Sequence, residues 1–375
     1  MKIVYISDSI IPSRAANSIH VMKMCQAFAH HGHDVVLLAP DKKDGLEPGV
    51  EDFFGFYGVK QSFKLRRIAW RALKGWSYIY GRMAACSALS YDPDLVFCRN
   101  FLGCYFTALS GQDVVFETHA PMINSGKIKQ WYFNRLIRRK ELKKLVVITH
   151  SLKSHYEEYY PILKGRIYVA PDCADIVPDC TKPIEFPDKG KRMQVGYVGH
   201  LYRGRGVELI ADIARRCHWA DFHFVGGTDV DVKKWKKELK GIPNCWFHGF
   251  VSPSLAVRYR AAFDVVLAPY QREVSVSGGG GDTSKWMSPL KVFEYMSARK
   301  AIISSDLPSL REVLKDEVNS LLCDPENVCE WEQALLRLSK DGDLAQRIAQ
   351  SAHDDFVCNY TWQARAERLV KKGGA

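Results

Sequence analysis

The chain has 375 residues, 47% of them hydrophobic, and a formal net charge of +11. One hydrophobic core rarely serves a chain of this length, so we expect two domains. No stretch reaches the roughly 20 consecutive apolar residues of a membrane-spanning helix. The 11 cysteines include no C-x-x-C pair, which argues against a zinc site or a disulfide framework. We therefore expect a cytoplasmic protein whose positive charge favours an acidic partner.

Short runs rich in valine and isoleucine alternate with stretches of helical period, the pattern of parallel sheets covered by crossover helices. In the first half we expect strands at residues 2–7, 34–38, 95–99, 113–117, 145–148 and 167–170. In the second half we expect strands at residues 193–198, 221–225, 245–248, 264–267, 301–304 and 320–323. The pattern predicts an α/β chain of two doubly wound, Rossmann-like domains.

The two domains are expected at residues 1–172 and 192–355. Residues 173–191 are rich in proline and have no sustained apolar period, so they are the expected linker. The remaining residues, 356–375, are predicted to be helical after a break near Asn359.

One stretch with chemical potential follows the expected strand 193–198. It reads Gly199-His-Leu-Tyr-Arg-Gly-Arg-Gly206 and precedes a helical pattern. A glycine-rich turn that opens a helix presents backbone N–H groups and a positive dipole end to an anion. Arg203 and Arg205 add positive charge. The alternative is an ordinary strand-to-helix turn with solvated arginines.

A second stretch is Ser288-Pro-Leu-Lys-Val-Phe-Glu294. Pro289 suits the first turn of a helix, and Glu294 then lies about one turn further on, where its carboxylate could accept from both hydroxyls of a ribose. The alternative for Glu294 is an exposed helical acid. Both stretches follow expected parallel strands of one domain, where open α/β sheets bind nucleotides.

Together, Gly199-x5-Arg205-Gly206 and Ser288-Pro-Leu-Lys-x2-Glu294 resemble the donor-binding domain of glycosyltransferase family 4, the retaining enzymes of GT-B fold. Asn244-x4-Gly249 and, in the first half, Glu117-Thr-His-Ala-Pro121 also fit that family. The resemblance implies two Rossmann-like domains facing across a cleft, the first for the acceptor and the second for the nucleotide-sugar. It also implies that the C-terminal helix returns to the first domain.

The same resemblance implies roles for individual residues. Arg205 would neutralise the donor diphosphate and Glu294 would bind the ribose, while His119 would face the transferred sugar; Arg205 and His119 are the expected catalytic residues. The expected donor-binding residues are His200, Arg203, Arg205, Ser288, Pro289, Leu290, Lys291 and Glu294. The expected first-domain loop near the donor is Arg14, Ala15 and Ala16.

The implied function is a hexosyltransferase-type glycosyl transfer (EC 2.4) with retention of configuration, from a nucleotide-sugar to a glycan or lipid-linked acceptor. It would serve cell-surface polysaccharide or glycolipid assembly and need neither metal nor cofactor, because preorganised cations stabilise the leaving diphosphate. Two alternatives remain. One is a nucleotide-sugar epimerase or hydrolase on the same fold. The other is a non-catalytic scaffold, suggested by His200 and Trp286, where many members carry arginine and glutamate.

The remaining motifs have structural or surface interpretations. The Asp-x-Asp pairs at Asp92 and Asp229 lie where aspartate suits turns and helix caps, and Gly278–Gly281 is expected to be a mobile loop beside the donor site. Two basic, aromatic stretches, residues 60–80 and 127–144, are predicted to be helices that lie on the anionic inner face of a membrane. The alternative is a pair of core-packed helices with solvated basic faces. No nucleic-acid recognition module is present.

Overall fold

The computed structural model describes residues 1–186, 192–275 and 282–371. Residues 187–191 of the expected linker and the run Gly278–Gly281 therefore lie outside the described residues. The chain forms two compact units: unit 1 is Met1–Pro171 with Trp362–Ala375, and unit 2 is Asp172–Thr361.

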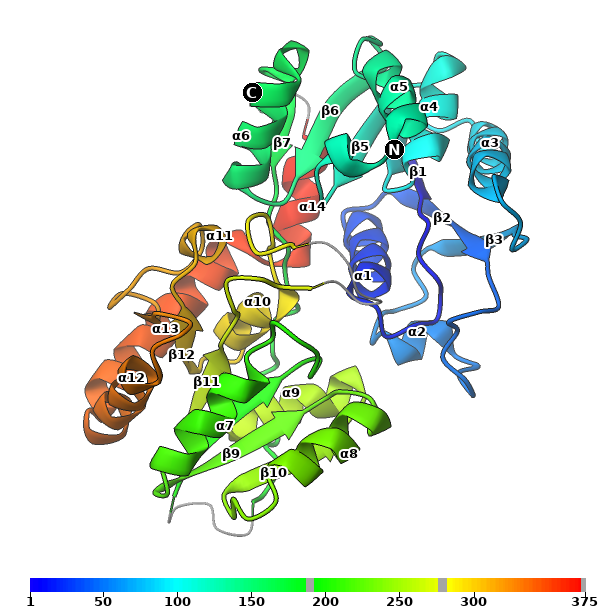
Figure 1. Cartoon of the computed structure of the whole chain (residues 1–375). Coiled ribbons are helices and arrows are strands. Elements are labelled where there is room, and N and C mark those ends of the chain that lie inside the picture. The colour runs from blue at the N-terminus through cyan, green and yellow to red at the C-terminus, as the bar shows by residue number, and fades with distance from the viewer. Residues whose placement is uncertain (187–191, 276–281, 372–375) are drawn as a thin grey trace. The chain divides into compact units, whose positions relative to one another are not determined.

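Unit 1 contains a parallel sheet of seven strands in the order β3-β2-β1-β4-β5-β6-β7 (Figure 1). The strands are β1 (Lys2–Ile6), β2 (Asp34–Asp41), β3 (Lys64–Ala69), β4 (Leu95–Cys98), β5 (Val114–Thr118), β6 (Leu142–Val147) and β7 (Ile167–Val169). The strand order reverses between β1 and β4, as it does in a doubly wound fold.

Helices connect these strands. They are α1 (Ala16–His30), α2 (Phe53–Phe56), α3 (Trp76–Leu89), α4 (Phe101–Leu109), α5 (Lys127–Leu136), α6 (His150–Tyr159) and the short 3₁₀ turns η1 (Met122–Asn124) and η2 (Pro161–Leu163). The last helix of the chain, α14 (Trp362–Val370), also belongs to unit 1. It packs on α1, where the Trp362 and His20 rings meet edge to face at 5.1 Å. The expected return of the C-terminal helix is thus confirmed, although this helix begins at Trp362, not at residue 356.

Unit 2 contains a parallel sheet of six strands in the order β10-β9-β8-β11-β12-β13. The strands are β8 (Met193–Val198), β9 (Ala220–Val225), β10 (Cys245–Gly249), β11 (Val265–Ala268), β12 (Ala301–Ser305) and β13 (Leu321–Cys323). Its order reverses between β8 and β11, so the nucleotide-binding edge of such a sheet lies beyond their carboxyl ends.

The helices of unit 2 cover both faces of its sheet (Figure 1). They are α7 (Val207–Arg216), α8 (Asp229–Glu238), α9 (Pro253–Ala262), α10 (Leu290–Ser297), α11 (Pro308–Arg311), α12 (Val328–Lys340) and α13 (Gly342–Asn359). Alternate residues of β11 enter separate cores: Val265 and Leu267 pack with α7 and α12, whereas Val266 and Ala268 pack with α10 and α13. A strand buried on both faces must be apolar throughout, which explains the continuous run Val-Val-Leu-Ala.

The helical prediction for the two basic stretches was wrong in part. Residues 64–69 form β3, an edge strand, and only α3 follows it as a helix. Charged side chains are typical of edge strands because they discourage pairing with other chains. In the second stretch α5 ends at Leu136, and residues 142–147 form β6.

The structural interpretation of the two Asp-x-Asp pairs is confirmed. Asp94 Oδ2 accepts a hydrogen bond from the Lys2 N–H at 2.7 Å. Asp231 and Thr228 form a reciprocal capping box at the start of α8, an arrangement that satisfies the first N–H groups of the helix. In the described part of the chain, none of the helices is both long and apolar enough to cross a membrane.

Candidate functional site

The glycine-rich loop after β8 packs tightly against the segment that follows β11. Gly206 has φ +79°, and a Cβ atom there would lie 1.8 Å from the Pro269 carbonyl oxygen. Gly204 has φ +85°, and its Cβ would lie 2.4 Å from the Glu273 carbonyl oxygen. Only glycine combines these left-handed conformations with such close approach. The two loops at the switch point of the sheet are therefore held against each other by backbone contact.

Arg205 projects from this loop between two tyrosine rings. Its guanidinium carbon lies 4.9 Å from the ring centroid of Tyr202 and 5.4 Å from that of Tyr270. Its Nη2 donates to Tyr202 Oη at 2.8 Å, and its buried Nε has no hydrogen-bond partner among the described residues. Tyr270 follows β11, so the arginine joins the two loops.

Lys291 lies in the first turn of α10 and is only 8% exposed. Its Nζ stands 3.8 Å from the ring centroid of Tyr197 and 4.9 Å from that of Tyr270. Within the described residues this Nζ makes no hydrogen bond. Burial and the charge of Arg205 lower the pKa of Lys291 well below its usual range, while Glu294 opposes them. Two cations are thus crowded around Tyr270 with incomplete compensation.

A bound anion would compensate the positive charge of Arg205 and Lys291. A buried cation without a counter-charge is unfavourable, and an anion at this place would gain charge-assisted hydrogen bonds from both side chains. The helices α7 and α10 begin here without a side-chain cap from the described residues, whereas α8 and α9 are capped by Thr228 and Ser252. Their first N–H groups add to the positive potential.

Glu294 is the acidic member of the site. Its side chain is 34% exposed, and Oε2 accepts from Nη1 of the buried Arg260 at 3.2 Å. The next residue, Tyr295, accepts a hydrogen bond from the Val198 N–H at 2.8 Å, which ties α10 to the carboxyl end of β8. Glu294 is therefore held in place beside the glycine-rich loop.

The other predicted donor-binding residues have varied surroundings. His200 is exposed, its ring stacks on Tyr202, and its carbonyl accepts from Tyr197 Oη at 2.6 Å. Arg203 is exposed as well. The Ser288 hydroxyl is buried and accepts from the Asp172 N–H at 2.9 Å.

Two further members lie at the start of α10. Pro289 is the residue before the helix, with ψ 124°, so the prediction that it lies inside the first turn was wrong by one position. Leu290 is half-buried and is the first helical residue. The structure thus brings Arg205, Lys291 and Glu294 together, and it gives Ser288 a structural hydrogen bond.

The predicted loop of unit 1 opens α1. Arg14 forms an ion pair with Glu47, with Nε 2.7 Å from Oε2. Ala15 and Ala16 are exposed, and Ala15 precedes the first helical turn in an extended conformation. The arginine is thus committed to a neighbouring carboxylate, while the two alanines present their backbone to solvent.

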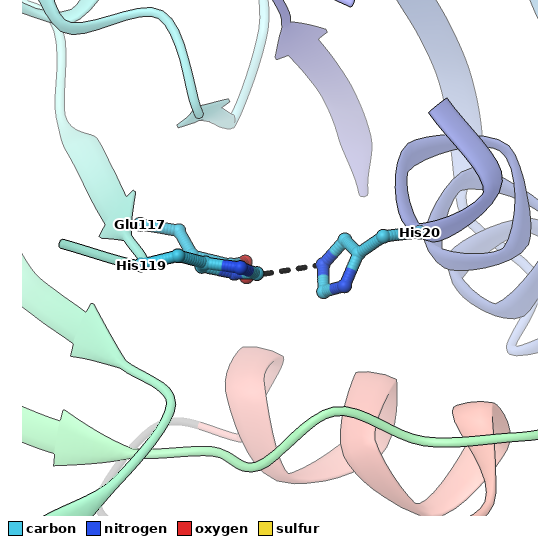
Figure 2. Close-up of side chains that lie close together, drawn as sticks. All are labelled: His20, Glu117 and His119. Carbon is cyan, nitrogen blue, oxygen red and sulfur yellow. Dashed lines mark hydrogen bonds and ion pairs between the residues drawn. The ribbon is translucent and has the colours of Figure 1, made fainter. Parts of the chain in front are cut away.

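His119 belongs to a compact polar cluster at the carboxyl end of β5. Figure 2 shows His20 reaching from α1 toward Glu117 and His119. Glu117 Oε1 lies 2.7 Å from His119 Nε2, 3.0 Å from His20 Nε2 and 3.0 Å from Arg365 Nη2. Burial raises the pKa of Glu117, but Arg365 above all, with both histidines, holds it well below its usual range.

Comparison with known proteins identifies the chain. A model described as "Glycosyltransferase Family 4" matches residues 18–177, and one described as "Glycosyl transferases group 1" matches residues 192–341. Between them the models match well over half of the chain. The protein belongs to the family 4 glycosyltransferases. It is a glycosyltransferase (EC 2.4) that takes its sugar from a nucleotide-sugar.

Several solved structures are similar in fold to this family 4 glycosyltransferase. Sucrose-phosphate synthase from Thermosynechococcus elongatus has a TM-score of 0.74 at 15% identity, over 98% of this chain and 97% of that chain. Anabaena HepE in complex with UDP-glucose has a TM-score of 0.71 at 13% identity, over 98% of both chains. The lipopolysaccharide outer core galactosyltransferase WaaB has a TM-score of 0.66 at 15% identity, over 98% of both. The fold is GT-B. No curated protein matches the sequence.

The family 4 glycosyltransferase has site residues that sequence reasoning missed. Glu117 and Arg365 are 248 positions apart yet form a fully buried ion pair. Each carried a signal: Glu117 is a carboxylate inside an apolar strand, and Arg365 lies on the apolar helical stripe with Trp362, Ala366 and Leu369. In unit 2 the missed residues are Tyr197, Tyr202, Arg260 and Tyr270.

In the described ranges, one group of side chains has the composition of a metal site: His20, Glu117 and His119. Its geometry does not favour a cation, because both oxygens of Glu117 already face Arg365, with Oε2 3.4 Å from Nη1. A metal ion on Oε1 would meet the guanidinium at close range. We therefore describe this cluster as a hydrogen-bonded ion pair.

Proposed function

We propose that the protein transfers a hexosyl group, with retention of configuration and without a metal, from a nucleotide-sugar to a glycan or lipid-linked acceptor of cell-surface polysaccharide or glycolipid assembly. Unit 2 binds the donor in this proposal, and unit 1 binds the acceptor. The family membership supports the reaction class, and the particular residues support the division of roles.

The observation that carries the proposal is the cation pair Arg205 and Lys291. Both lie at the switch point of the unit 2 sheet, both flank Tyr270, and both keep hydrogen-bond donors without partners in the described residues. A diphosphate fits them because it carries charge on two neighbouring phosphates. When the glycosidic bond breaks, negative charge grows on the β-phosphate, and cations already in place stabilise that charge as it forms.

Other residues complete the assignment. Glu294 retains exposed surface beside the pair and is assigned to the ribose hydroxyls. His119 is assigned to the transferred sugar, because its side chain is 22% exposed while Glu117 beneath it is buried. The backbone at Ala15 and Ala16 is assigned to the donor as well.

The test is donor turnover by the wild type, Arg205→Ala and a matched control, Arg215→Ala, whose side chain is exposed in the last turn of α7. UDP-, GDP- and ADP-linked hexoses are each incubated with and without acceptor extract. We expect one nucleotide to support acceptor-dependent transfer in the wild type and in the control. In Arg205→Ala we expect turnover to fall at least 100-fold, the scale seen when a group that stabilises the transition state is removed. Turnover without acceptor would indicate a hydrolase or epimerase. Unchanged turnover in Arg205→Ala would contradict the assignment.

We also propose that unit 1 lies on an anionic membrane surface. The aromatic side chains Tyr78 of α3 and Tyr132 of α5 meet at 5.7 Å, so the two helices are linked through these rings. Large apolar side chains are exposed nearby, among them Ile128 at 66% and Trp131 at 49%. The exposed basic residues of the same two sequence stretches include Arg71, Lys74, Lys127, Lys129 and Arg135. Apolar residues that enter the interface, surrounded by basic residues that meet lipid head groups, are typical of peripheral attachment.

Vesicle co-sedimentation tests this second proposal. The full chain is mixed with vesicles of phosphatidylcholine alone or with phosphatidylglycerol added, at moderate salt. We expect binding to the anionic vesicles only, weakened at least tenfold in Ile128→Ser/Trp131→Ser and unchanged in Trp246→Ser, a control at an equally exposed tryptophan of unit 2. Absence of binding by the wild type would contradict the proposal.

A further inference from the structure

The guanidinium of Arg365 is fully enclosed in unit 1 and fully used. Its Nε donates to the Pro171 carbonyl at 2.9 Å, and Nη2 donates to the Ala170 carbonyl at 3.1 Å and to Glu117 Oε1 at 3.0 Å. Its Nη1 lies 3.4 Å from both Glu117 Oε2 and Met24 Sδ. A guanidinium has five N–H groups in a fixed fork, so five acceptors fix its position completely.

The buried ion pair between Arg365 and Glu117 carries a desolvation cost in free energy. Taking both charges out of water carries a penalty that the attraction between them repays only with good geometry. Arg365 does more than fill space in the apolar stripe of α14, because the Glu117 carboxylate and the Pro171 and Ala170 carbonyls all accept from it. The consequence for the site lies on the other side of Glu117, where its carboxylate meets two imidazole rings.

The ionised carboxylate has no proton to give. An imidazole nitrogen that is hydrogen-bonded to Oε1 must therefore carry the proton itself. In His119 this nitrogen is Nε2, at 2.7 Å, and Nε2 of His20 is also close to Oε1, at 3.0 Å. In the neutral form of His119, the proton is then on Nε2 and the lone pair on Nδ1. Of the four side chains, His119 is the one with substantial exposure.

We propose that Arg365, from the C-terminal helix, is a positioning residue: by keeping Glu117 a carboxylate, it fixes His119 in the Nε2–H tautomer, so that Nδ1 is the ring atom able to accept a hydrogen bond when the transferred sugar binds. This inference rests on the proposed function, in which His119 faces that sugar. The tautomer itself can be measured without any substrate.

The buried neighbours restrain the ring further. His20 lies between Trp362 and His119, with edge-to-face contacts at 5.1 Å and 5.2 Å. Both Trp362 and Arg365 come from α14. One helix therefore sets the protonation pattern through Glu117 and limits the tilt of the His119 ring through His20.

The experiment is NMR of the full-length protein carrying ¹⁵N,¹³C-labelled histidine, with His119 assigned by its loss in His119→Gln. We expect the Nε2–H tautomer in the neutral ring of the wild type and of Arg365→Lys, which keeps a positive charge. In Glu117→Gln the amide can donate to an imidazole nitrogen, so we expect His119 to populate the Nδ1–H tautomer. The Nδ1–H tautomer in the wild type would overturn the proposal, and this result needs no variant to fold.

Kinetics with the active nucleotide-sugar complete the test. We expect kcat of Glu117→Gln to fall on the order of 100-fold, the scale of a misplaced catalytic group, while KM for the donor stays unchanged. We also expect Arg365→Lys to be substantially more active than Arg365→Met. Leu369→Ala, which removes a buried side chain of the same helix, should lower Tm but keep both tautomer and kcat. An altered tautomer with unchanged kcat would overturn the positioning role. Absence of turnover with every donor would instead count against the proposed function, since the tautomer is read separately.

Discussion

Arg260 on α9 donates a hydrogen bond from Nη1 to Glu294 Oε2 on α10, across 3.2 Å. Arg260 is buried and its Nε has no hydrogen-bond partner among the described residues, whereas Glu294 is partly exposed. The pair fixes one carboxylate oxygen, which leaves Oε1 as the better-placed acceptor for a ligand hydroxyl. Glu294 is thus both an anchor for Arg260 and a candidate ribose acceptor.

We predict that Glu294→Gln weakens nucleoside diphosphate binding by about tenfold to a hundredfold, the range of a lost hydrogen bond to a charged group. Binding of inorganic pyrophosphate, which has no ribose, should not weaken. Titration calorimetry with both ligands measures the difference. If pyrophosphate and nucleotide weakened equally, Glu294 would act on the phosphates and the ribose assignment would be wrong.

Lys291 gives a prediction about pH. Burial and Arg205 lower its pKa in the ligand-free protein, and a bound diphosphate would raise that pKa by favouring the charged form. Between the two pKa values, binding takes up a proton, so affinity falls as pH rises through that window and is constant below the ligand-free pKa. Calorimetry in buffers of different ionisation enthalpy measures the uptake. Lys291→Met should abolish it; uptake that persists in this variant would belong to another group.

Gly206 gives a prediction about stability. In Gly206→Ala the new methyl would meet the Pro269 carbonyl in addition to the strain of φ +79°. Gly32 is a matched control, because it has φ +78° and nothing lies within 4 Å of the position of its Cβ. We expect Gly32→Ala to cost about 1–2 kcal/mol, and Gly206→Ala to cost about 1–3 kcal/mol more because of overpacking. An equal decrease in the free energy of unfolding of the two variants, measured with denaturant, would show that the loop accommodates the extra methyl group without overpacking.

His119→Ala is predicted to lower turnover more than nucleotide affinity. The side chain is assigned to the sugar and lies in unit 1, whereas the cations assigned to the diphosphate lie in unit 2. Donor turnover and titration with the nucleoside diphosphate alone separate the two effects. An equal loss in both would place His119 in nucleotide binding or in folding.

Much of the fold follows from local pattern. Apolar runs such as Val265-Val-Leu-Ala268 predict buried parallel strands, and the break near Asn359 separates two helices as expected. The strand β3, Lys64-Leu-Arg-Arg-Ile-Ala69, was not predicted because three of its six residues are basic. At the edge of a sheet a strand needs little apolar surface, so hydrophobic period is a weak guide there.

The candidate site was predictable only where its residues share a motif. Arg205, Lys291 and Glu294 follow strands in recognisable local patterns, but the burial of Lys291 between Tyr197 and Tyr270 depends on elements far apart in sequence. Local sequence patterns cannot identify which distant residue will form an ion pair with a buried charge. Glu117 and Arg365, each unusual in an apolar setting, could have been flagged singly but not paired.

The most direct measurement of the central claim is thermal stabilisation of the full chain by UDP-, GDP- and ADP-linked sugars, in the wild type and in Lys291→Met. A ligand present at 100 times its dissociation constant stabilises the folded state by about 2.7 kcal/mol, which gives a clear rise in Tm. The account predicts a rise with one nucleotide in the wild type and its loss in Lys291→Met. No rise with any nucleotide, or an equal rise in the variant, would contradict the assignment of the cation pair to the donor diphosphate.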